Sequence, residues 1–149
     1  LENTAGQGTA LGYRFEHLQT IREQTKNSER IAYCLDTCHL FAAGYPLADK
    51  KSYEETMKKI EDILKVDMIK ALHLNDALKE RDSRVDRHCH IGEGEIGASG
   101  FKLLMNDSRW ENVPKILETP VENKEWEKYY GKNLKTLLNY IQNNQGDVK

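Results

Sequence analysis

The sequence predicts an α/β fold in which the strands of a parallel sheet alternate with helices, and it predicts half of an eight-stranded (β/α)8 barrel. Short apolar runs alternate with longer amphipathic segments four times along the chain, an order typical of a parallel sheet covered by helices. Each apolar run ends at a side chain that can bind a metal, namely Glu2, Asp36, His73 or Glu118. Ligands of α/β proteins bind at the carboxyl ends of the strands.

The first half of the chain is expected to contain two strand–helix units. The helices carry apolar side chains at the spacing of one helical face. Ser52 is followed three residues later by Glu55, a capping box that predicts Ser52 as the N-cap of a helix. The expected elements are the end of a strand at 1–4, a glycine-rich loop at 5–12, a helix at 13–25, a strand at 31–35, a loop at 40–49 and a helix at 51–65.

The second half is expected to contain two further units. Residues 76–97 form the longest irregular stretch, and loops of this length inside a compact domain are usually functional or disordered. We assign residues 1–143 to one domain and 144–149 to a flexible tail. The other expected elements are a strand at 69–74, a helix at 98–107, a strand at 113–117 and a helix at 123–143, whose apolar face holds Trp126, Tyr130, Leu134, Leu137 and Ile141.

Composition excludes several classes of protein. No apolar run is long enough to span a membrane. The formal net charge of −2 gives no bulk attraction to nucleic acid, so any DNA contact must come from local positive loops or from bound metal. The three cysteines contain no Cys-x-x-Cys pair and suggest no disulfide framework, which favours a reducing compartment.

The beginning of the chain indicates that a preceding segment is missing. The first residue is Leu1 rather than methionine, and it lies inside an expected strand with Glu2 as its metal-ligand candidate. Half of a barrel would leave two open sheet edges. We therefore expect an amino-terminal half-barrel to supply the other strands, and the lack of a signal peptide says nothing about targeting.

The candidate ligands predict two neighbouring metal sites. Carboxylates and imidazoles without thiolates suit zinc, manganese or iron(II), and the four strand-end residues could surround one ion while a carboxylate bridges to another. Asp86 and His88 lie two residues apart in an extended loop, so their side chains point the same way. With His39 they form a three-point site with the open position that catalytic metals keep.

Each of these residues also has an ordinary structural explanation. A single histidine at a strand end is more often a hydrogen-bonded structural residue, a single glutamate is more often a cap or an ion-pair partner, and charges in a loop are usually solvated. These explanations are much weaker for all seven residues together, because every one of them lies at a strand end or in a single loop.

Five stretches carry a resemblance to a known family: Leu1–Gly8, Asp36–Tyr45, His73–Asp76, Ser83–His88 and Gly92–Gly94. They resemble endonuclease IV, the family of zinc-dependent endonucleases that act on abasic sites. The similarity runs from the first residue to about the last helix. It implies a TIM barrel of the xylose-isomerase-like kind that holds three zinc ions, with this chain as its carboxyl-terminal half.

The resemblance also implies a role for each candidate ligand. Glu2 bridges two zinc ions, Asp36, His73 and Glu118 complete the site of one of them, and His39, Asp86 and His88 hold the third. Two further histidines would come from the absent half, so the chain encodes two complete sites and the bridging ligand of another. Glu2 and Glu118 are the catalytic candidates, with Glu118 orienting the nucleophile.

The implied activity is hydrolysis of the phosphodiester bond 5′ to an abasic site in double-stranded DNA, together with the removal of blocking groups from 3′ ends. Zinc would lower the pKa of a water molecule to give the nucleophile. This is a step in base excision repair, which implies a cytoplasmic location in a bacterium or wherever DNA is repaired. Arg84 and Arg87 are candidate phosphate contacts, with ordinary solvated charge as an equal alternative.

Two other hypotheses remain open. The first is a metal-dependent sugar isomerase or epimerase on the same barrel, which would use fewer metals and no third site. The Asp86–His88 pair argues against it. The second is a truncated, inactive fragment that self-associates across its open edges or needs the missing half-barrel.

Overall fold

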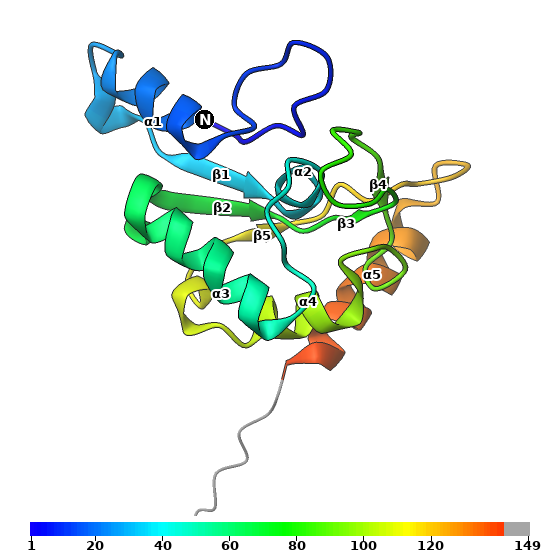
Figure 1. Ribbon diagram of the computed structural model, residues 1–149. Coiled ribbons are helices and arrows are strands. Elements are labelled where there is room, and N and C mark those ends of the chain that lie inside the picture. The colour runs from blue at the N-terminus through cyan, green and yellow to red at the C-terminus, as the bar shows by residue number, and fades with distance from the viewer. Residues whose placement is uncertain (142–149) are drawn as a thin grey trace, which may run out of the picture.

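The computed structural model describes residues 1–141, and these contain a parallel sheet whose strands follow chain order. Strands β1 (Tyr33–Asp36), β2 (Ile69–His73) and β5 (Lys115–Ile116) lie side by side and run in parallel (Figure 1). Residues 1–3 extend along the other side of β1, where the N–H of Cys34 donates to the carbonyl of Leu1 at 2.7 Å. The predicted α/β class with a parallel sheet is confirmed. The tail predicted at 144–149 lies outside the described residues, and the domain boundary at 143 stays a prediction.

Helices connect the strands and cover the sheet. Helix α3 contacts α4, and α4 contacts α5. Side chains of β1, β2, α3 and the segment around Trp110 belong to one buried apolar cluster. Within the described chain, no helix is both long and apolar enough to cross a membrane. The helical elements are α1 (Phe15–Glu23), η1 (Ser28–Arg30), α2 (Thr37–Ala42), α3 (Lys50–Lys59), the π-helical η2 (Ile60–Leu64), η3 (Val66–Met68), α4 (Gly97–Met105), η4 (Ser108–Trp110) and α5 (Trp126–Tyr140).

The start of helix α3 corrects the predicted capping box. The helix begins at Lys50, and the side chain of Asp49 accepts a hydrogen bond from the N–H of Ser52 at 3.1 Å. Ser52 therefore lies in the first turn, and its hydroxyl donates back to the carbonyl of Asp49 at 3.3 Å. Asp49 is the cap because its carboxylate can reach the free N–H groups of the first turn.

The stretch at 76–97 is more regular than the sequence suggests. Strands β3 (Asp76–Ala77) and β4 (His88–Cys89) form an antiparallel ribbon. The buried carboxylate of Asp76 holds the segment that follows, because it accepts hydrogen bonds from the N–H groups of Gly92 at 2.9 Å, Gly94 at 3.0 Å and Ile96 at 3.0 Å. Burial raises the pKa of Asp76, while hydrogen bonds from backbone N–H groups, those of Gly94 and Ile96 among them, act in the opposite direction. One side chain thus organises a loop that has little regular structure.

Helix α5 is shorter than predicted and leaves most of its apolar face uncovered. Asn123 and Lys124 have positive φ angles of 51° and 59°, which delay the start of the helix until Trp126. Leu137 is buried, but Trp126 is 55% exposed, Leu134 51%, Leu138 63% and Ile141 40%. In the described residues no strand pairs with the outer edge of β5, where Ile116 is 45% exposed. We call these five exposed apolar side chains, from Ile116 and α5, the open face.

The role of Asp76 gives a stability prediction. The substitution Asp76→Asn keeps the shape of the side chain but turns an NH2 group toward backbone N–H donors. We expect it to lower the free energy of unfolding by about 1–3 kcal/mol, because buried N–H groups lose their acceptor. Urea denaturation followed by circular dichroism measures this. Asp62→Asn, at an exposed position in η2, is the matched control. Equal effects of the two substitutions would contradict the role given to Asp76.

Candidate metal centre

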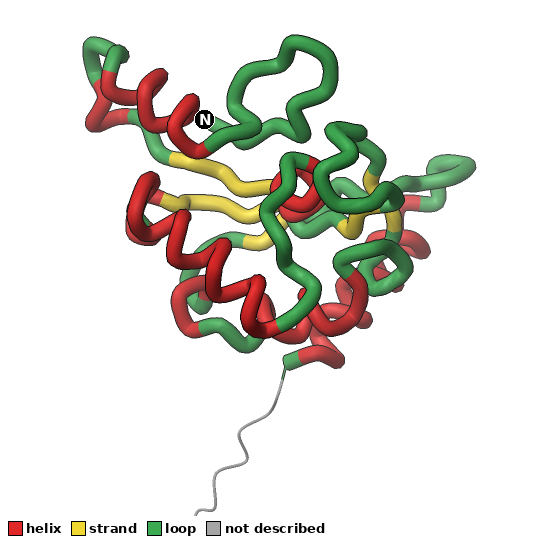
Figure 2. The backbone as a smooth tube through the Cα atoms, in the orientation of Figure 1, coloured by secondary structure: helices red, strands yellow, loops and turns green. Residues whose placement is uncertain are grey.

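The carboxyl ends of the parallel strands bring the predicted ligands to one edge of the sheet. Asp36 and His73 are the last residues of β1 and β2, and Glu118 lies two residues beyond β5. Glu2 lies beside β1, opposite Cys34. Figure 1 shows α2, β3 and β4 at the tips of the strand arrows, and Figure 2 shows loop segments around the same end.

The four strand-end residues form the first of two side-chain clusters. One ligand atom each of Glu2, Asp36, His73 and Glu118 lies within 4.8 Å of the other three. His73 Nδ1 is 3.2 Å from Glu2 Oε1, 3.2 Å from Glu118 Oε2 and 3.9 Å from Asp36 Oδ2. An imidazole nitrogen thus faces three carboxylates from three different segments of the chain.

His39, Asp86 and His88 form the second cluster, and their ligand atoms also lie within 4.8 Å of one another. Asp86 stands between the two histidines, with Oδ2 at 3.1 Å from His39 Nε2 and Oδ1 at 3.4 Å from His88 Nε2. The two clusters adjoin at Asp36, whose Oδ2 is 3.7 Å from His88 Nε2.

Local structure explains the spacing of Asp36 and His39. Asp36 is the cap of α2, and its Oδ1 accepts the N–H of His39 at 3.0 Å. The cap fixes the position of His39 in the first turn of the helix, from which the imidazole reaches the second cluster. The resemblance described above implies that the two residues serve different ions, and in the structure they belong to different clusters.

Backbone carbonyls orient two of the imidazoles. His39 Nδ1 donates to the carbonyl of Asn3 at 2.9 Å, and His88 Nδ1 donates to the carbonyl of Glu118 at 3.1 Å. Each bond leaves Nε2 directed toward Asp86, the arrangement typical of metal-binding histidines. Burial lowers the pKa of His39, but the charges of Asp36 and Asp86 and the carbonyl of Asn3 outweigh it, so the pKa is raised overall.

Two unsatisfied nitrogens test whether a metal would fit. Within residues 1–141, His73 Nδ1 and His88 Nε2 are the buried side-chain atoms without a hydrogen-bond partner. An unpaired buried polar group costs about 1–3 kcal/mol. His73 Nδ1 lies in the first cluster and His88 Nε2 in the second, and both face carboxylate oxygens. A metal ion in each cluster would give both nitrogens a partner. The residues present therefore fit a metal with nitrogen and oxygen ligands, such as zinc.

A family model described as xylose isomerase-like TIM barrel matches residues 1–140. The chain belongs to this family. Curated relatives named probable endonuclease 4 support the resemblance to endonuclease IV. The protein from Chloroflexus aggregans is 51% identical over 120 residues, which cover 80% of this chain and 42% of the relative. The protein from Geotalea daltonii is 46% identical over 142 residues, which cover 95% of this chain and 49% of the relative.

A solved structure agrees with these relatives. The crystal structure of endonuclease IV from Thermus thermophilus matches with a TM-score of 0.79 and 34% identity, covering 93% of this chain and 48% of that one. The resemblance to endonuclease IV is thereby confirmed. The chain spans about half the length of the relatives it matches. That the seven residues bind metal stays a prediction.

Two of the three cysteines of this TIM-barrel chain lie close to candidate ligands. Cys34 lies near Glu2 and His73, and Cys38 near Asp36 and His88. Burial, followed by nearby carboxylates, raises the pKa of Cys34 to about 11, and burial raises that of Cys38 to about 12. Burial thus disfavours the thiolate at both positions, while the carboxylates and imidazoles supply the oxygen and nitrogen donors of the two clusters.

The two arginines predicted to contact phosphate differ in their surroundings. Arg84 lies over the ring of Tyr13, with Cζ 4.2 Å from the ring centroid, and its Nε is 3.2 Å from Asp82 Oδ1. Arg87 is exposed, and its Nη1 donates to the carbonyl of Asp86 at 2.6 Å. Arg84 thus packs against the glycine-rich loop, whereas Arg87 leaves most of its donors at the surface beside the second cluster.

Sequence reasoning missed the buried polar side chains that support the ligands. Asn3 Oδ1 accepts the N–H of Asp36 at 2.7 Å, and the Thr37 hydroxyl donates to the carbonyl of Asn75 at 2.6 Å. Both side chains are buried. Their signal in the sequence was a polar residue directly beside a candidate ligand at a strand end.

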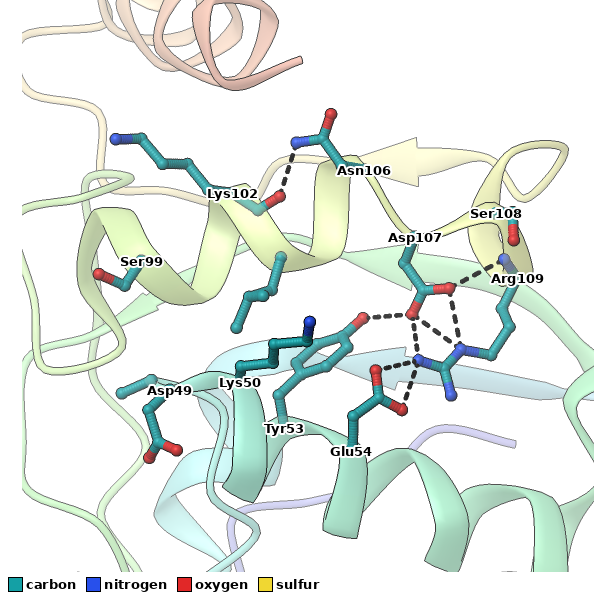
Figure 3. Close-up of a pocket in the computed structure, with 12 residues that line it drawn as sticks. Asp49, Lys50, Tyr53, Glu54, Ser99, Lys102, Asn106, Asp107, Ser108 and Arg109 are labelled. Carbon is teal, nitrogen blue, oxygen red and sulfur yellow. Dashed lines mark hydrogen bonds and ion pairs between the residues drawn. The ribbon is translucent and has the colours of Figure 1, made fainter. Parts of the chain in front are cut away.

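A separate cavity of about 790 Å³ lies between α3 and α4 (Figure 3). Its charged side chains largely neutralise one another, since Arg109 lies between Asp107, at 2.8 Å, and Glu54, at 3.0 Å. The hydroxyl of Tyr53 donates to Asp107 at 2.8 Å. No residue of the two clusters lines this cavity, so the chemistry belongs at the strand ends.

Proposed function

We propose that this chain is the carboxyl half of a zinc-dependent DNA-repair endonuclease that cleaves 5′ to abasic sites and removes blocking groups from 3′ ends. The observation that carries the proposal is the pair of adjoining clusters, each with an imidazole nitrogen that lacks a partner. The names of the relatives indicate an endonuclease. An enzyme with this role would act where DNA is repaired, which in a bacterium is the cytoplasm.

The proposed ligand sets follow the clusters. Asp36, His73 and Glu118 would hold one ion that Glu2 shares with a further ion, and His39, Asp86 and His88 would hold another. When bound, zinc supplies Lewis-acid stabilisation of the phosphate and a strong nucleophile at neutral pH. The protein supplies the geometry, because each imidazole is oriented by a backbone carbonyl or by flanking carboxylates.

The exposed residues at the rim would act on the DNA. The side chain of Glu118 is 48% exposed while it stays 3.2 Å from His73 Nδ1, so it can orient a nucleophile or accept its proton beside the cluster. Arg87 is the better placed of the two arginines to bind a phosphate, because Arg84 is engaged with Tyr13. An abasic nucleotide enters such a site at low cost because no base has to be unstacked.

Metal content tests the proposed ligands. We expect His88→Ala to lose one zinc ion per chain relative to the unsubstituted protein, because His88 Nε2 belongs to the second cluster. His90→Ala is the matched control: this histidine lies two residues further on, stacks on Tyr129 and belongs to neither cluster. Zinc is measured by mass spectrometry after gel filtration. Equal zinc in all three proteins would show that the ligands are misplaced.

Incision of a defined duplex tests the function. The chain is combined with the amino-terminal half of a full-length relative and given a duplex with one abasic-site analogue. We expect a nick on the 5′ side that a chelator abolishes and zinc restores. A zinc-loaded complex that leaves the duplex intact would overturn the proposal. Two or fewer bound ions together with isomerisation of a sugar would favour the alternative hypothesis of a sugar isomerase or epimerase.

The open face supports the half-barrel part of the proposal. The sheet order follows chain order, as in a (β/α)8 barrel, and the outer edge of β5 has no strand beside it in residues 1–141. Ile116 at this edge and the apolar side chains of α5 are exposed as well. A second half-barrel would pair with β5 and cover the open face, and without it two copies of this chain would associate there.

Self-association of the isolated chain tests this idea. We expect Leu138→Lys to shift the chain toward the monomer, because it adds a charge at the most exposed side chain of the open face, which is 63% exposed. Asn139→Lys introduces the same side chain at the next exposed position of α5 and should leave association unchanged. Light scattering after gel filtration measures the mass of each protein. A monomeric unsubstituted chain would contradict association through this face.

A further inference from the structure

We propose that Asn75 is a positioning residue that holds Asp36 and Glu118 at a fixed separation and so sets the geometry of both clusters. The inference rests on the proposed function, since it concerns residues assigned to the metal sites. Asn75 follows β2, is fully buried and belongs to neither cluster.

The amide of Asn75 joins the ends of two other strands. Its Nδ2 donates to Asp36 Oδ2 at 2.6 Å, and its Oδ1 accepts the N–H of Glu118 at 2.9 Å. The backbone is held as well, because the N–H of Asn75 donates to Thr37 Oγ1 at 2.9 Å and its carbonyl accepts the same hydroxyl at 2.6 Å. A single residue thus connects the carboxyl ends of β1, β2 and β5.

The sheet itself does not fix the position of Glu118. Strand β5 contains only Lys115 and Ile116, and its last backbone bond to β2 runs from the N–H of Leu74 to the carbonyl of Ile116 at 2.7 Å. Beyond that point, the bond from Glu118 to the side chain of Asn75 takes the place of the backbone ladder. The bond to Asn75 therefore holds the backbone from which the Glu118 carboxylate projects.

The effect of Asn75 extends to the second cluster. The carbonyl of Glu118 accepts the hydrogen bond of His88 Nδ1 at 3.1 Å, which directs His88 Nε2 toward Asp86. A continuous series of hydrogen bonds thus runs from Asp36 through Asn75 and Glu118 to His88. The amide of Asn75 supplies an N–H donor for Asp36 and an oxygen acceptor for Glu118 at the same time, whereas an ionised carboxylate lacks the donor and an apolar side chain lacks both.

The experiment compares zinc affinity in variants of two buried asparagines. Asn75→Ala removes both side-chain bonds, and we expect about 10–100-fold weaker zinc binding, the usual effect of losing a partner of metal ligands. Asn133→Ala is the matched control: Asn133 is equally buried and also bonds at both ends of its amide, to the N–H of Ile91 at 2.8 Å and to Thr119 Oγ1 at 3.0 Å. We expect it to keep normal zinc affinity. Affinity is measured by competition with a chromophoric chelator, using zinc alone.

A second variant covers the case in which Asn75→Ala does not fold. Asn75→Asp keeps the size and the acceptor for Glu118 but replaces the neutral amide with a second buried carboxyl group against Asp36, so that the two carboxyl groups repel or share a proton. With cobalt in place of zinc, we expect its visible absorption bands to differ from those of the unsubstituted chain and of Asn133→Ala.

The outcomes separate this inference from the proposed function. If the unsubstituted chain binds zinc and both Asn75 variants bind it with unchanged affinity and unchanged cobalt spectra, Asn75 does not position the ligands and the metal centre stands. If the unsubstituted chain takes up no zinc, the proposed centre fails and this inference fails with it. Incision by the complete protein without any effect at Asn75 would likewise remove only the inference.

Discussion

The arrangement of the strand ends depends on the compensation of one buried charge. The carboxylate of Asp36 is fully buried, and burying a charge is costly unless hydrogen bonds and opposite charges compensate it. Oδ1 accepts the N–H of His39, and Oδ2 accepts the amide of Asn75. His73 and His88 each place a nitrogen within 4 Å of Oδ2. Because these partners come from α2, β2 and β4, satisfying this single group draws three parts of the chain together.

Much of the fold could be predicted, because the spacing of apolar residues indicates each strand and helix locally and the geometry of a parallel sheet then places the strand ends. Alternation of apolar runs with amphipathic segments gives the parallel sheet, and the rule about carboxyl ends places Glu2, Asp36, His73 and Glu118 together. The ribbon of β3 and β4 could not be predicted, since it pairs Asp76 with Cys89 and Ala77 with His88 across a long loop. The bonds that Asp76 accepts from N–H groups 16 to 20 residues further along the chain are equally non-local. The apolar stripe of α5 was visible in the sequence, but periodicity does not say what covers a helix face.

The residues of the candidate site also include some that the sequence could predict and some that it could not. Ligand types at strand ends, and the two-residue spacing of Asp86 and His88, can be read from the sequence. The supporting amides of Asn3 and Asn75 could not be chosen among many similar residues, because their partners are set by the packing of separate strands. The same holds for Arg84, whose contact with Tyr13 joins two loops that are distant in sequence.

The protonated thiols beside the clusters affect how the protein tolerates oxidants. Peroxides and disulfides react with thiolates far faster than with thiols, and the raised pKa values of Cys34 and Cys38 keep the thiolate fraction very small at neutral pH. Sulfur atoms next to the imidazoles therefore make poor targets for peroxide. Packing acts in the same direction, because the side chain of Cys38 is fully buried and a dissolved oxidant cannot reach its sulfur without opening the fold.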